Sequence, residues 1–160
     1  MLKVTVIAVG KIKEKFLSAA IDEYAKRLSL YCQFEVVEVK DEKTPENPTE
    51  VEKEAVLDRE AERILQKIPK GAKVITLCVE GKQMSSEKFA DMISDYSVNG
   101  VSHLVFVIGG SMGLSDKVKS LSDKRLSFSE MTFPHMLMRV ILAEQIYRGF
   151  TIISGKTYHK

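Results

Sequence analysis

The sequence predicts an α/β fold in which helices cover both faces of a mainly parallel sheet. Short apolar runs rich in β-branched residues alternate with segments whose apolar residues recur at helical spacing. The runs "KVITLCV" and "HLVFVI" are continuously apolar, which is typical of strands buried on both faces. The connections are short and no repeat or linker interrupts the chain, so we expect residues 1–160 to form one domain.

Two strands and two helices are expected in the first half of the chain. "KVTVIAV" at 3–9 and "FEVVEV" at 34–39 have the composition of strands. Residues 14–28 repeat apolar side chains at helical spacing, and residues 51–68 form a charged amphipathic pattern that ends at "PKG". The polar, proline-broken stretch at 40–49 is the one loop that we expect to be flexible.

Three further strands and three further helices are expected in the second half. Ser85 can cap the first of these helices, and Pro134 suits the first turn of the last one. The strands are predicted at 73–79, 103–108 and 125–129, and the helices at 85–97, near 115–121 and from Pro134 to Arg148.

The last helix is apolar on more than one face. Leu137, Ile141 and Leu142 widen its apolar stripe far beyond what one face of a sheet can cover. We therefore expect a second copy of the chain to cover the remainder in a two-fold contact, which makes the protein a homodimer. The charged residues of the helix would then lie at a rim where two subunits and a ligand pocket meet. The apolar stripe consists of Met136, Val140, Ala143 and Tyr147.

The composition argues against membrane and metal proteins. Charged residues break the apolar runs before the roughly 20 residues that a membrane helix needs. The start, "MLKVTVIAVGKIKEK", lacks the cleavage site of a signal peptide, so we expect a cytoplasmic protein. Cys32 and Cys78 form neither a disulfide framework nor a metal-ligand pattern, and we expect both thiols to be inert.

The net charge of +2 conceals an asymmetry. Residues 35–63 contain 11 acidic and 5 basic side chains, a local charge of −6, which leaves 19 basic and 11 acidic side chains, or +8, elsewhere. A basic body of this kind could present a surface to a polyanion. A solvated acidic helix with scattered lysines explains the same numbers equally well.

Three loops are candidates for a binding site, because ligands of such sheets bind beyond the carboxyl ends of the strands. They are "LCVEGKQMS", "IGGSMGL" and "SEMTFPH". Gly109, Gly110 and Gly113 match neither the dinucleotide fingerprint nor the P-loop, and they indicate either close approach to a ligand or a tight turn. The third loop could form a wall for a flat heterocycle, or simply the start of a helix.

Several polar residues near the end of the chain are candidates for chemistry. Glu144 and Arg148 are four residues apart and can pair on the helix surface, whereas Arg139 lies on another flank. His103 is expected to be structural, and His135 could cap or orient the last helix. The tail "SGKTYHK" combines Lys156, Tyr158, His159 and Lys160, which suits stacking on a base and binding phosphate, but is also typical of a frayed terminus.

Four separated blocks resemble one known family. They are "VITLCVEGKQMSSEKFA", "FVIGGSMGL", "LSFSEMTFPHMLMRVILAEQIYR" and the ending "YHK". Together with "VIAVGKIKEKF" and the "DEK.PEN" loop, they make essentially the whole chain similar to the ribosomal RNA large subunit methyltransferase H family. Members of that family are small SPOUT methyltransferases.

The resemblance implies a function and a cofactor. The family uses S-adenosylmethionine to methylate N3 of pseudouridine 1915 in helix 69 of 23S ribosomal RNA. It has a C-terminal trefoil knot, which periodicity cannot reveal, and acts as a homodimer. An assembled ribosome is the expected substrate, in preference to a bare RNA hairpin. By the family pattern, the cofactor residues would be Leu77, Gly109, Phe128, Ser129, Glu130, Met131, Thr132 and Phe133.

The implied reaction needs no metal, since the methyl group of the cofactor is already activated. Pseudouridine must lose its N3 proton, so a base or a nearby cation would help. We consider His159 and Glu144 as proton acceptors, and Arg139 or Arg148 as stabilisers of negative charge. Tyr158 is a further candidate because of its place in the tail.

Other functions compete with this interpretation. A ribosome-associated RNA-binding protein without enzymatic activity would use the glycine loop only as structure. A nucleotide-dependent oxidoreductase is disfavoured by the broken glycine fingerprint. A SPOUT enzyme that acts on transfer RNA differs only in its target, and only the family resemblance argues against it.

Overall fold

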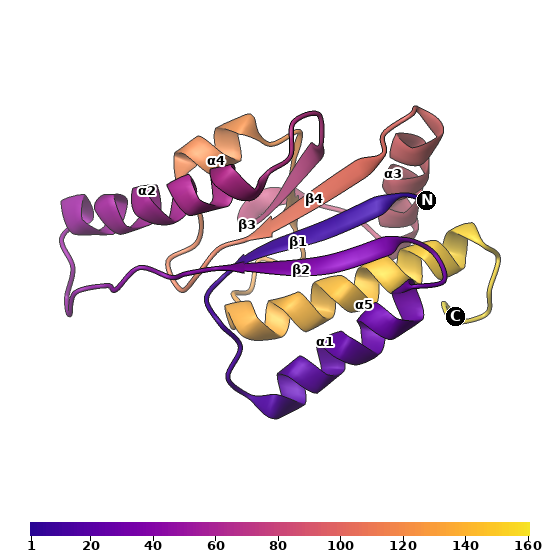
Figure 1. Cartoon of the computed structure of the whole chain (residues 1–160), viewed down its shortest axis with the longest axis horizontal. Helices are drawn as coiled ribbons and strands as arrows, with labels where there is room; N and C mark the ends of the chain where they lie inside the picture. Colours follow the sequence, from indigo (N-terminus) through magenta and orange to yellow (C-terminus); the bar gives the residue numbers. More distant parts are fainter.

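A computed structural model describes residues 1–160, which form one five-stranded parallel sheet in the order β2-β1-β4-β3-β5 (Figure 1). The predicted α/β fold with a mainly parallel sheet is confirmed. No helix is both long enough and apolar enough to cross a membrane. The strands are β1 Lys3–Val9, β2 Gln33–Val39, β3 Lys73–Gln83, β4 His103–Ile108 and β5 Lys124–Ser127. The helices are α1 Lys15–Leu28, α2 Glu50–Lys67, α3 Ser86–Val98, α4 Asp116–Leu121 and α5 His135–Ile153.

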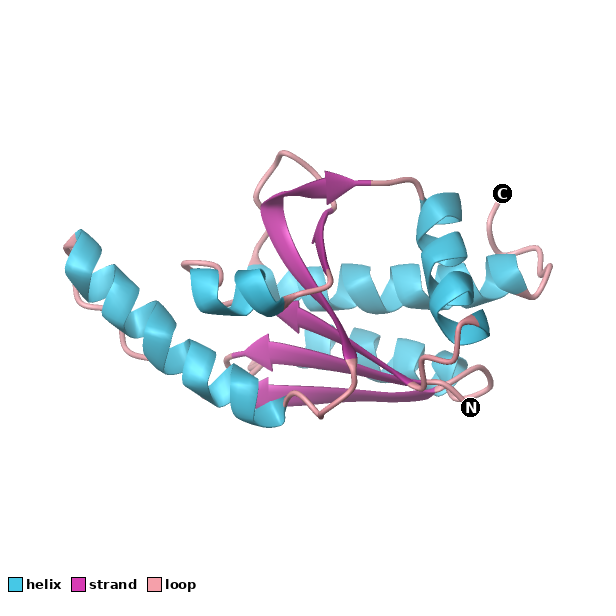
Figure 2. Cartoon of the chain, turned by 90° about the horizontal axis from the view of Figure 1, so that it is seen from above, coloured by secondary structure: helices cyan, strands magenta, loops and turns pink.

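The helices form two layers around the sheet (Figure 2). Alternate side chains of β1 show this arrangement: Val4 and Val6 belong to a core beneath α1, α3 and α5, whereas Ile7 and Val9 belong to a second core beneath α2 and α4. Strands covered on both faces must be apolar at every position. The continuous apolar runs in the sequence therefore predicted the layering correctly.

Local hydrogen bonds fix the starts of two helices. The Ser85 hydroxyl accepts from the Lys88 amide at 3.1 Å, so Ser85 is the N-cap of α3 as predicted. Thr49 and Glu52 form a capping box at the start of α2. This box sets the end of the polar loop at 40–49.

Side chains of α2 hold that loop in place. Arg63 donates to the Glu42 carboxylate at 2.6 Å and to the Lys40 carbonyl at 3.0 Å. The buried Glu60 carboxylate accepts from the Glu42 amide at 2.9 Å. The loop after β2 is therefore fastened to α2 through four charged residues.

Helix α5 lies beside both α1 and α3 on one face of the sheet. Leu142, Ile146 and Phe150 are buried in the core that α5 shares with α1, α3 and the sheet. The periodicity of α5 alone could not show that these helices cover it. Leu137 nevertheless remains 39% exposed, and Ile141 is half-buried. Part of the apolar surface of α5 is thus left uncovered by the protomer itself.

The candidate active site

One cavity of about 690 Å³ opens beside the second half of β3, where β4 and β5 end and α5 begins. All three candidate segments line it, together with the first turn of α5. The expectation that the first of these segments is a loop is wrong, because β3 continues to Gln83 and includes residues 77–80. Its apolar wall includes Leu77, Ile108 and Leu126, and Met138 of α5 completes it. An enclosed apolar wall with a few polar groups is typical of a small-molecule site.

Most of the residues expected to bind a cofactor line this cavity. Glu130 does not line it, although it belongs to the same turn. Sequence reasoning did not single out Glu80 or Lys119 as cavity residues: Glu80 lies within one of the three candidate segments, whereas Lys119 lies on α4, outside them. His135, which the sequence suggested could cap or orient the helix, also lines the cavity. The expected residues that do line the cavity are Leu77, Gly109, Phe128, Ser129, Met131, Thr132 and Phe133.

The glycine loop after β4 is a tight turn that only glycine can form. Gly113 has φ +84° and donates its amide to the Gly110 carbonyl at 3.0 Å. A Cβ atom added at Gly109 would lie 2.2 Å from the Gly113 carbonyl oxygen. Gly109 is therefore required by the backbone of the turn, which itself forms one side of the cavity.

Two serines shape the turn after β5. The Ser127 hydroxyl donates to the Ser129 carbonyl at 3.0 Å, and the Ser129 hydroxyl accepts from the Met131 amide at 3.0 Å. Such local bonds stabilise a turn without regular secondary structure. They hold Thr132 and Phe133 at the edge of the cavity.

His135 is the first residue of α5 and lines the cavity, but it does not cap the helix. The N-cap is Pro134, which makes no side-chain bond. Burial lowers the pKa of His135 and the nearby charge of Arg139 lowers it further, so the imidazole is neutral at pH 7. Its buried Nδ1 atom has no hydrogen-bond partner.

Arg139 is 2% exposed and joins α5 to the ends of two strands. It donates to the Glu38 carboxylate at 2.6 Å, and to the Val9 and Gly10 carbonyls at 2.8 and 2.7 Å. The expectation that every charge of this helix lies at a rim is therefore wrong for Arg139. Three acceptors at the ends of β1 and β2 bind the two terminal nitrogens of a guanidinium that would otherwise be costly to bury, while its buried Nε has no hydrogen-bond partner.

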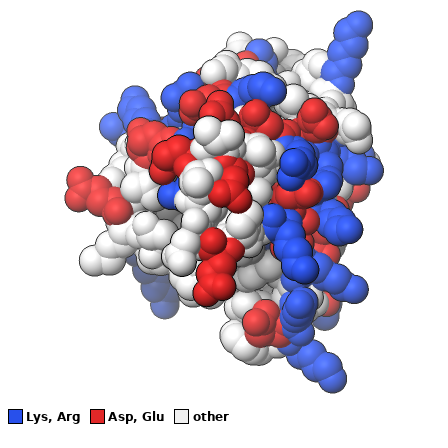
Figure 3. Space-filling view, turned by 90° about the vertical axis from the view of Figure 1, so that its left-hand side faces the viewer, with Lys and Arg blue, Asp and Glu red and all other residues white.

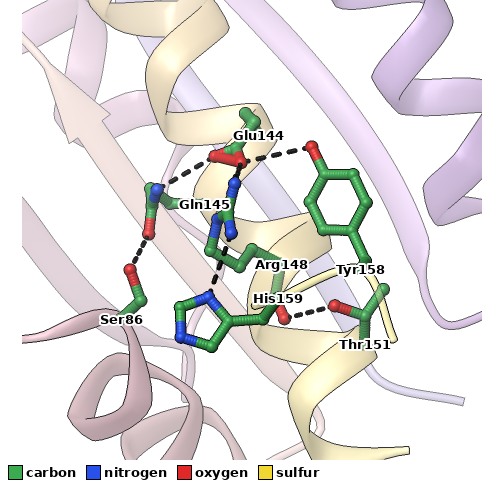
Figure 4. A network of polar contacts seen from close by, with 7 residues as sticks. All are labelled: Ser86, Glu144, Gln145, Arg148, Thr151, Tyr158 and His159. Carbon is green, nitrogen blue, oxygen red and sulfur yellow. Dashed lines mark hydrogen bonds and ion pairs between the residues drawn. The ribbon is translucent and has the colours of Figure 1, made fainter. Parts of the chain in front are cut away.

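The other four candidate catalytic residues form one network (Figure 4). Arg148 donates from Nε to Glu144 at 2.8 Å and approaches His159 Nδ1 at 3.0 Å, while the Tyr158 hydroxyl donates to Glu144 at 3.3 Å. His159 Nε2 lies 2.7 Å from Glu87 Oε1. The predicted pairing of Glu144 with Arg148 is confirmed, and the tail packs on α5 and α3.

The network fixes the protonation of its members. Arginine has no acceptor, so Arg148 must donate to Nδ1 of His159, and Nε2–H then donates to Glu87. Burial raises the pKa of Tyr158 to about 12, so its phenol remains protonated at neutral pH. Both proposed proton acceptors, His159 and Glu144, are thus already hydrogen-bonded in this arrangement.

The network and the cavity lie at different positions along α5. His135 lines the cavity, whereas Arg148 follows thirteen residues later, or about 20 Å along the helix axis. The tail residues do not line the cavity of their own protomer.

The two thiols are poor nucleophiles. Burial raises the pKa of Cys32 to about 12. Cys78 lines the cavity, and burial followed by the charge of Glu80 raises its pKa as well. No group of three or more His, Cys, Asp or Glu residues is arranged to hold a metal ion. The site thus contains no thiolate that could take up a transferred group at neutral pH.

Comparison with known proteins identifies the family. The family described as "Predicted SPOUT methyltransferase" matches residues 2–159. The chain belongs to the SPOUT methyltransferases. SPOUT methyltransferases generally use S-adenosylmethionine, and the lining of the cavity suits such a ligand, because it combines an apolar wall with the charged side chains of Glu80 and Lys119.

Related SPOUT proteins span the full length of this chain. "Ribosomal RNA large subunit methyltransferase H" of Clostridioides difficile (strain 630) is 52% identical over 99% of this chain and 100% of its own length. The protein of the same name from Acetivibrio thermocellus is 48% identical over the same shares. The resemblance noted in the sequence is thereby confirmed, and this SPOUT protein is an rRNA methyltransferase.

A solved structure supports the fold. A probable methylase family protein from Haemophilus influenzae Rd KW20 superposes with a TM-score of 0.55 at 13% identity, over 100% of this chain and 72% of the other. This likeness concerns the fold alone. The pairing of the strands does not by itself demonstrate the trefoil knot, which stays a prediction.

Proposed function

We propose that the protein is a cytoplasmic homodimer that transfers the methyl group of S-adenosylmethionine to N3 of pseudouridine 1915 in helix 69 of 23S rRNA, on the assembled ribosome. The observation that carries the proposal is the cavity. The second half of β3 and the loops after β4 and β5 converge on it in a chain whose full-length relatives are named as methyltransferases of the large-subunit ribosomal RNA.

The cofactor supplies an activated methyl group, and the protein holds the reactants in line. Leu77 of β3 and Phe133 of the turn after β5 flank the cavity on two sides. The rigid glycine turn at Gly109 fixes the third side. Seven of the eight proposed cofactor residues, all except Glu130, line this space.

The candidate groups for removing the N3 proton do not line the cavity of their own protomer. We propose that a second copy of the chain supplies the network of Glu144, Arg148, Tyr158 and His159. Exposed apolar side chains around the cavity and on α5 support such a contact: Met131 is 74% and Leu137 39% exposed. Arg139 acts at a distance by holding the first half of α5 against β1 and β2.

Replacing His159 by alanine is expected to lower the single-turnover rate of methyl transfer by roughly 10²- to 10⁴-fold, because a positioned acid or base contributes about that much. Rapid-quench measurement with labelled cofactor at saturation gives this rate. His103→Gln is the matched control, since His103 bonds to Thr5 at the opposite end of β4. An unchanged rate in the His159 variant would remove this residue from the mechanism.

The surface supports binding to a polyanion. Figure 3 shows the end of the molecule toward which β1 and β2 run, and Lys and Arg side chains gather in a band along its right-hand side. Asp and Glu lie mainly over its centre and left. Three lysines lie on α4 and at the start of β5: Lys117 pairs with Asp58 at 3.8 Å and Lys119 pairs with Glu80, whereas Lys124 has no carboxylate partner.

Affinity for ribosomes is expected to fall steeply with salt. Lys124→Gln should reduce the slope of log K against log salt by about 0.7 to 1, and Lys160→Gln by a similar amount, because each removes one phosphate contact. Equilibrium binding between 50 and 200 mM salt gives the slope. Lys53→Gln on the acidic helix α2 serves as the control, since Lys53 already pairs with Glu50. Equal slopes for all four proteins would exclude Lys124 and Lys160 from the RNA surface.

The proposal is tested by mapping modified nucleotides in 23S rRNA from cells that lack this protein. Loss of one N3-methyl group in helix 69, restored by the intact gene, is expected. If a methyl group is lost from transfer RNA instead, transfer RNA is the substrate. A non-enzymatic RNA-binding protein would leave all methylation intact and would give no heat on calorimetric titration with S-adenosylmethionine.

A further inference from the structure

The cavity contains one pair of opposite charges in an otherwise uncharged lining. Glu80 and Lys119 form an ion pair and are the only lining residues that carry a full charge, because His135 is neutral. Glu80 comes from the far part of β3, and Lys119 comes from α4. The two residues are 39 positions apart in the chain, and the fold alone brings them together.

An irregularity in the sheet places Glu80 at the cavity. The pairing of β3 with β5 shifts register between Leu77 and Lys82, so the intervening residues leave the regular ladder. Gly81 lies against the β5 backbone, where a Cβ atom would come within 2.8 Å of Leu126. This close approach fixes the irregular segment against β5 beside Glu80. Bulges are common next to active sites, where they redirect a side chain.

The lysine of this pair is shielded, whereas its carboxylate partner is not. The Lys119 side chain is 17% exposed and that of Glu80 is 54% exposed, while Lys73 and Lys117 in other pairs are 43% and 64% exposed. The hydrogen bond from Lys119 lowers the pKa of Glu80, so the carboxylate is charged at neutral pH. A ligand that enters the cavity therefore meets a shielded ammonium and a carboxylate at one end.

We propose that Lys119 and Glu80 together bind the amino-acid end of the cofactor, with Lys119 Nζ on its α-carboxylate and the Glu80 carboxylate on its α-ammonium. This inference rests on the proposed use of S-adenosylmethionine. An α-amino acid carries one charge of each sign, so it can insert between the members of an ion pair while each charge keeps an opposite partner. The apolar remainder of the cavity is left for the adenine.

The arrangement predicts discrimination between cofactor-like ligands. S-adenosylmethionine and S-adenosylhomocysteine both carry the amino-acid end, whereas 5′-methylthioadenosine keeps the adenine, ribose and sulfur but lacks it. Lys119→Met should weaken the binding of S-adenosylmethionine and S-adenosylhomocysteine by about ten- to a hundredfold, which is the value of a charge-assisted hydrogen bond. The affinity for 5′-methylthioadenosine should change less than twofold. Glu80→Gln should weaken the binding of S-adenosylmethionine and of S-adenosylhomocysteine to the same extent. Lys119→Arg should retain most of the discrimination.

Calorimetric titration of the full-length protein with each ligand tests this pattern, with thermal melting to show that each variant is folded. Lys73→Met is the control, since it breaks the pair with Asp123 at 3.6 Å outside the cavity. Wild-type protein that binds neither S-adenosylmethionine nor S-adenosylhomocysteine would contradict the proposed function itself.

Three other outcomes would overturn only the inference. The first is wild-type binding of the cofactor that Lys119→Met leaves unchanged. The second is that Lys119→Met weakens the binding of 5′-methylthioadenosine as much as that of S-adenosylmethionine, which would indicate general damage to the cavity. The third is a Glu80→Gln variant that loses S-adenosylmethionine but keeps S-adenosylhomocysteine, which would place Glu80 against the sulfonium charge.

Discussion

Replacing Gly109 by alanine is expected to weaken binding of S-adenosylmethionine at least a hundredfold. The added Cβ would lie 2.2 Å from the Gly113 carbonyl oxygen and 2.4 Å from its carbon. Both partners are backbone atoms, so the turn must open to relieve the overlap, and Gly110 and Met112 of the cavity wall move with it. Isothermal titration calorimetry measures the affinity directly.

Gly71→Ala is the matched control for this variant. Gly71 has φ +85°, but a Cβ there meets no atom within 4 Å. This variant should cost about 1–2 kcal/mol of stability through the left-handed backbone alone, and cofactor affinity should not change. A Gly109→Ala protein that binds cofactor as tightly as Gly71→Ala would show that the glycine turn does not shape the site.

Replacing Arg139 by alanine is expected to lower the free energy of unfolding by about 3 kcal/mol. The change leaves the Val9 and Gly10 carbonyls without their donor and removes the partner of Glu38. Glu38 is 38% exposed and can regain water, which places the effect at the low end of the range for buried pairs. Urea denaturation followed by circular dichroism measures the difference.

Arg27→Ala provides the comparison. Arg27 pairs with Glu23 on the surface of α1, where both side chains are more than 40% exposed, so its removal should cost less than about 1 kcal/mol. Equal losses in the two variants would mean that burial of Arg139 contributes nothing. Because Arg139 holds the start of α5, its loss should also weaken cofactor binding at the proposed site, whose wall includes Phe133 and Met138.

The order of the elements followed from local patterns, and so did the position of the cavity. Local patterns placed all ten helices and strands, the helices by their apolar spacing and the strands by their apolar, β-branched runs. The ends of β3 and α5 lie beyond the predicted residues 79 and 148, at Gln83 and Ile153. The rule that ligands bind at the carboxyl ends of parallel strands then selected the three segments that line the cavity. Both inferences needed only neighbours in the sequence.

Features that depend on distant residues could not be predicted in this way. Arg139 forms a hydrogen bond with Glu38, which is 101 positions away, and His159 forms one with Glu87, which is 72 positions away. The pair of Glu80 and Lys119 depends on the bulge in β3 and on the path of α4. Periodicity likewise could not show that α1 and α3 cover much of α5, because helical spacing reports how apolar a face is, not what packs against it.

Transfer of a labelled methyl group by the purified protein tests the central claim most directly. Ribosomes from cells lacking the protein are incubated with methyl-labelled S-adenosylmethionine, and the labelled nucleotide is identified by mass spectrometry of 23S rRNA fragments. The proposed function predicts one methyl group per ribosome, on N3 of the pseudouridine in helix 69. Ribosomes that take up no label, or label on any other nucleotide, would contradict it.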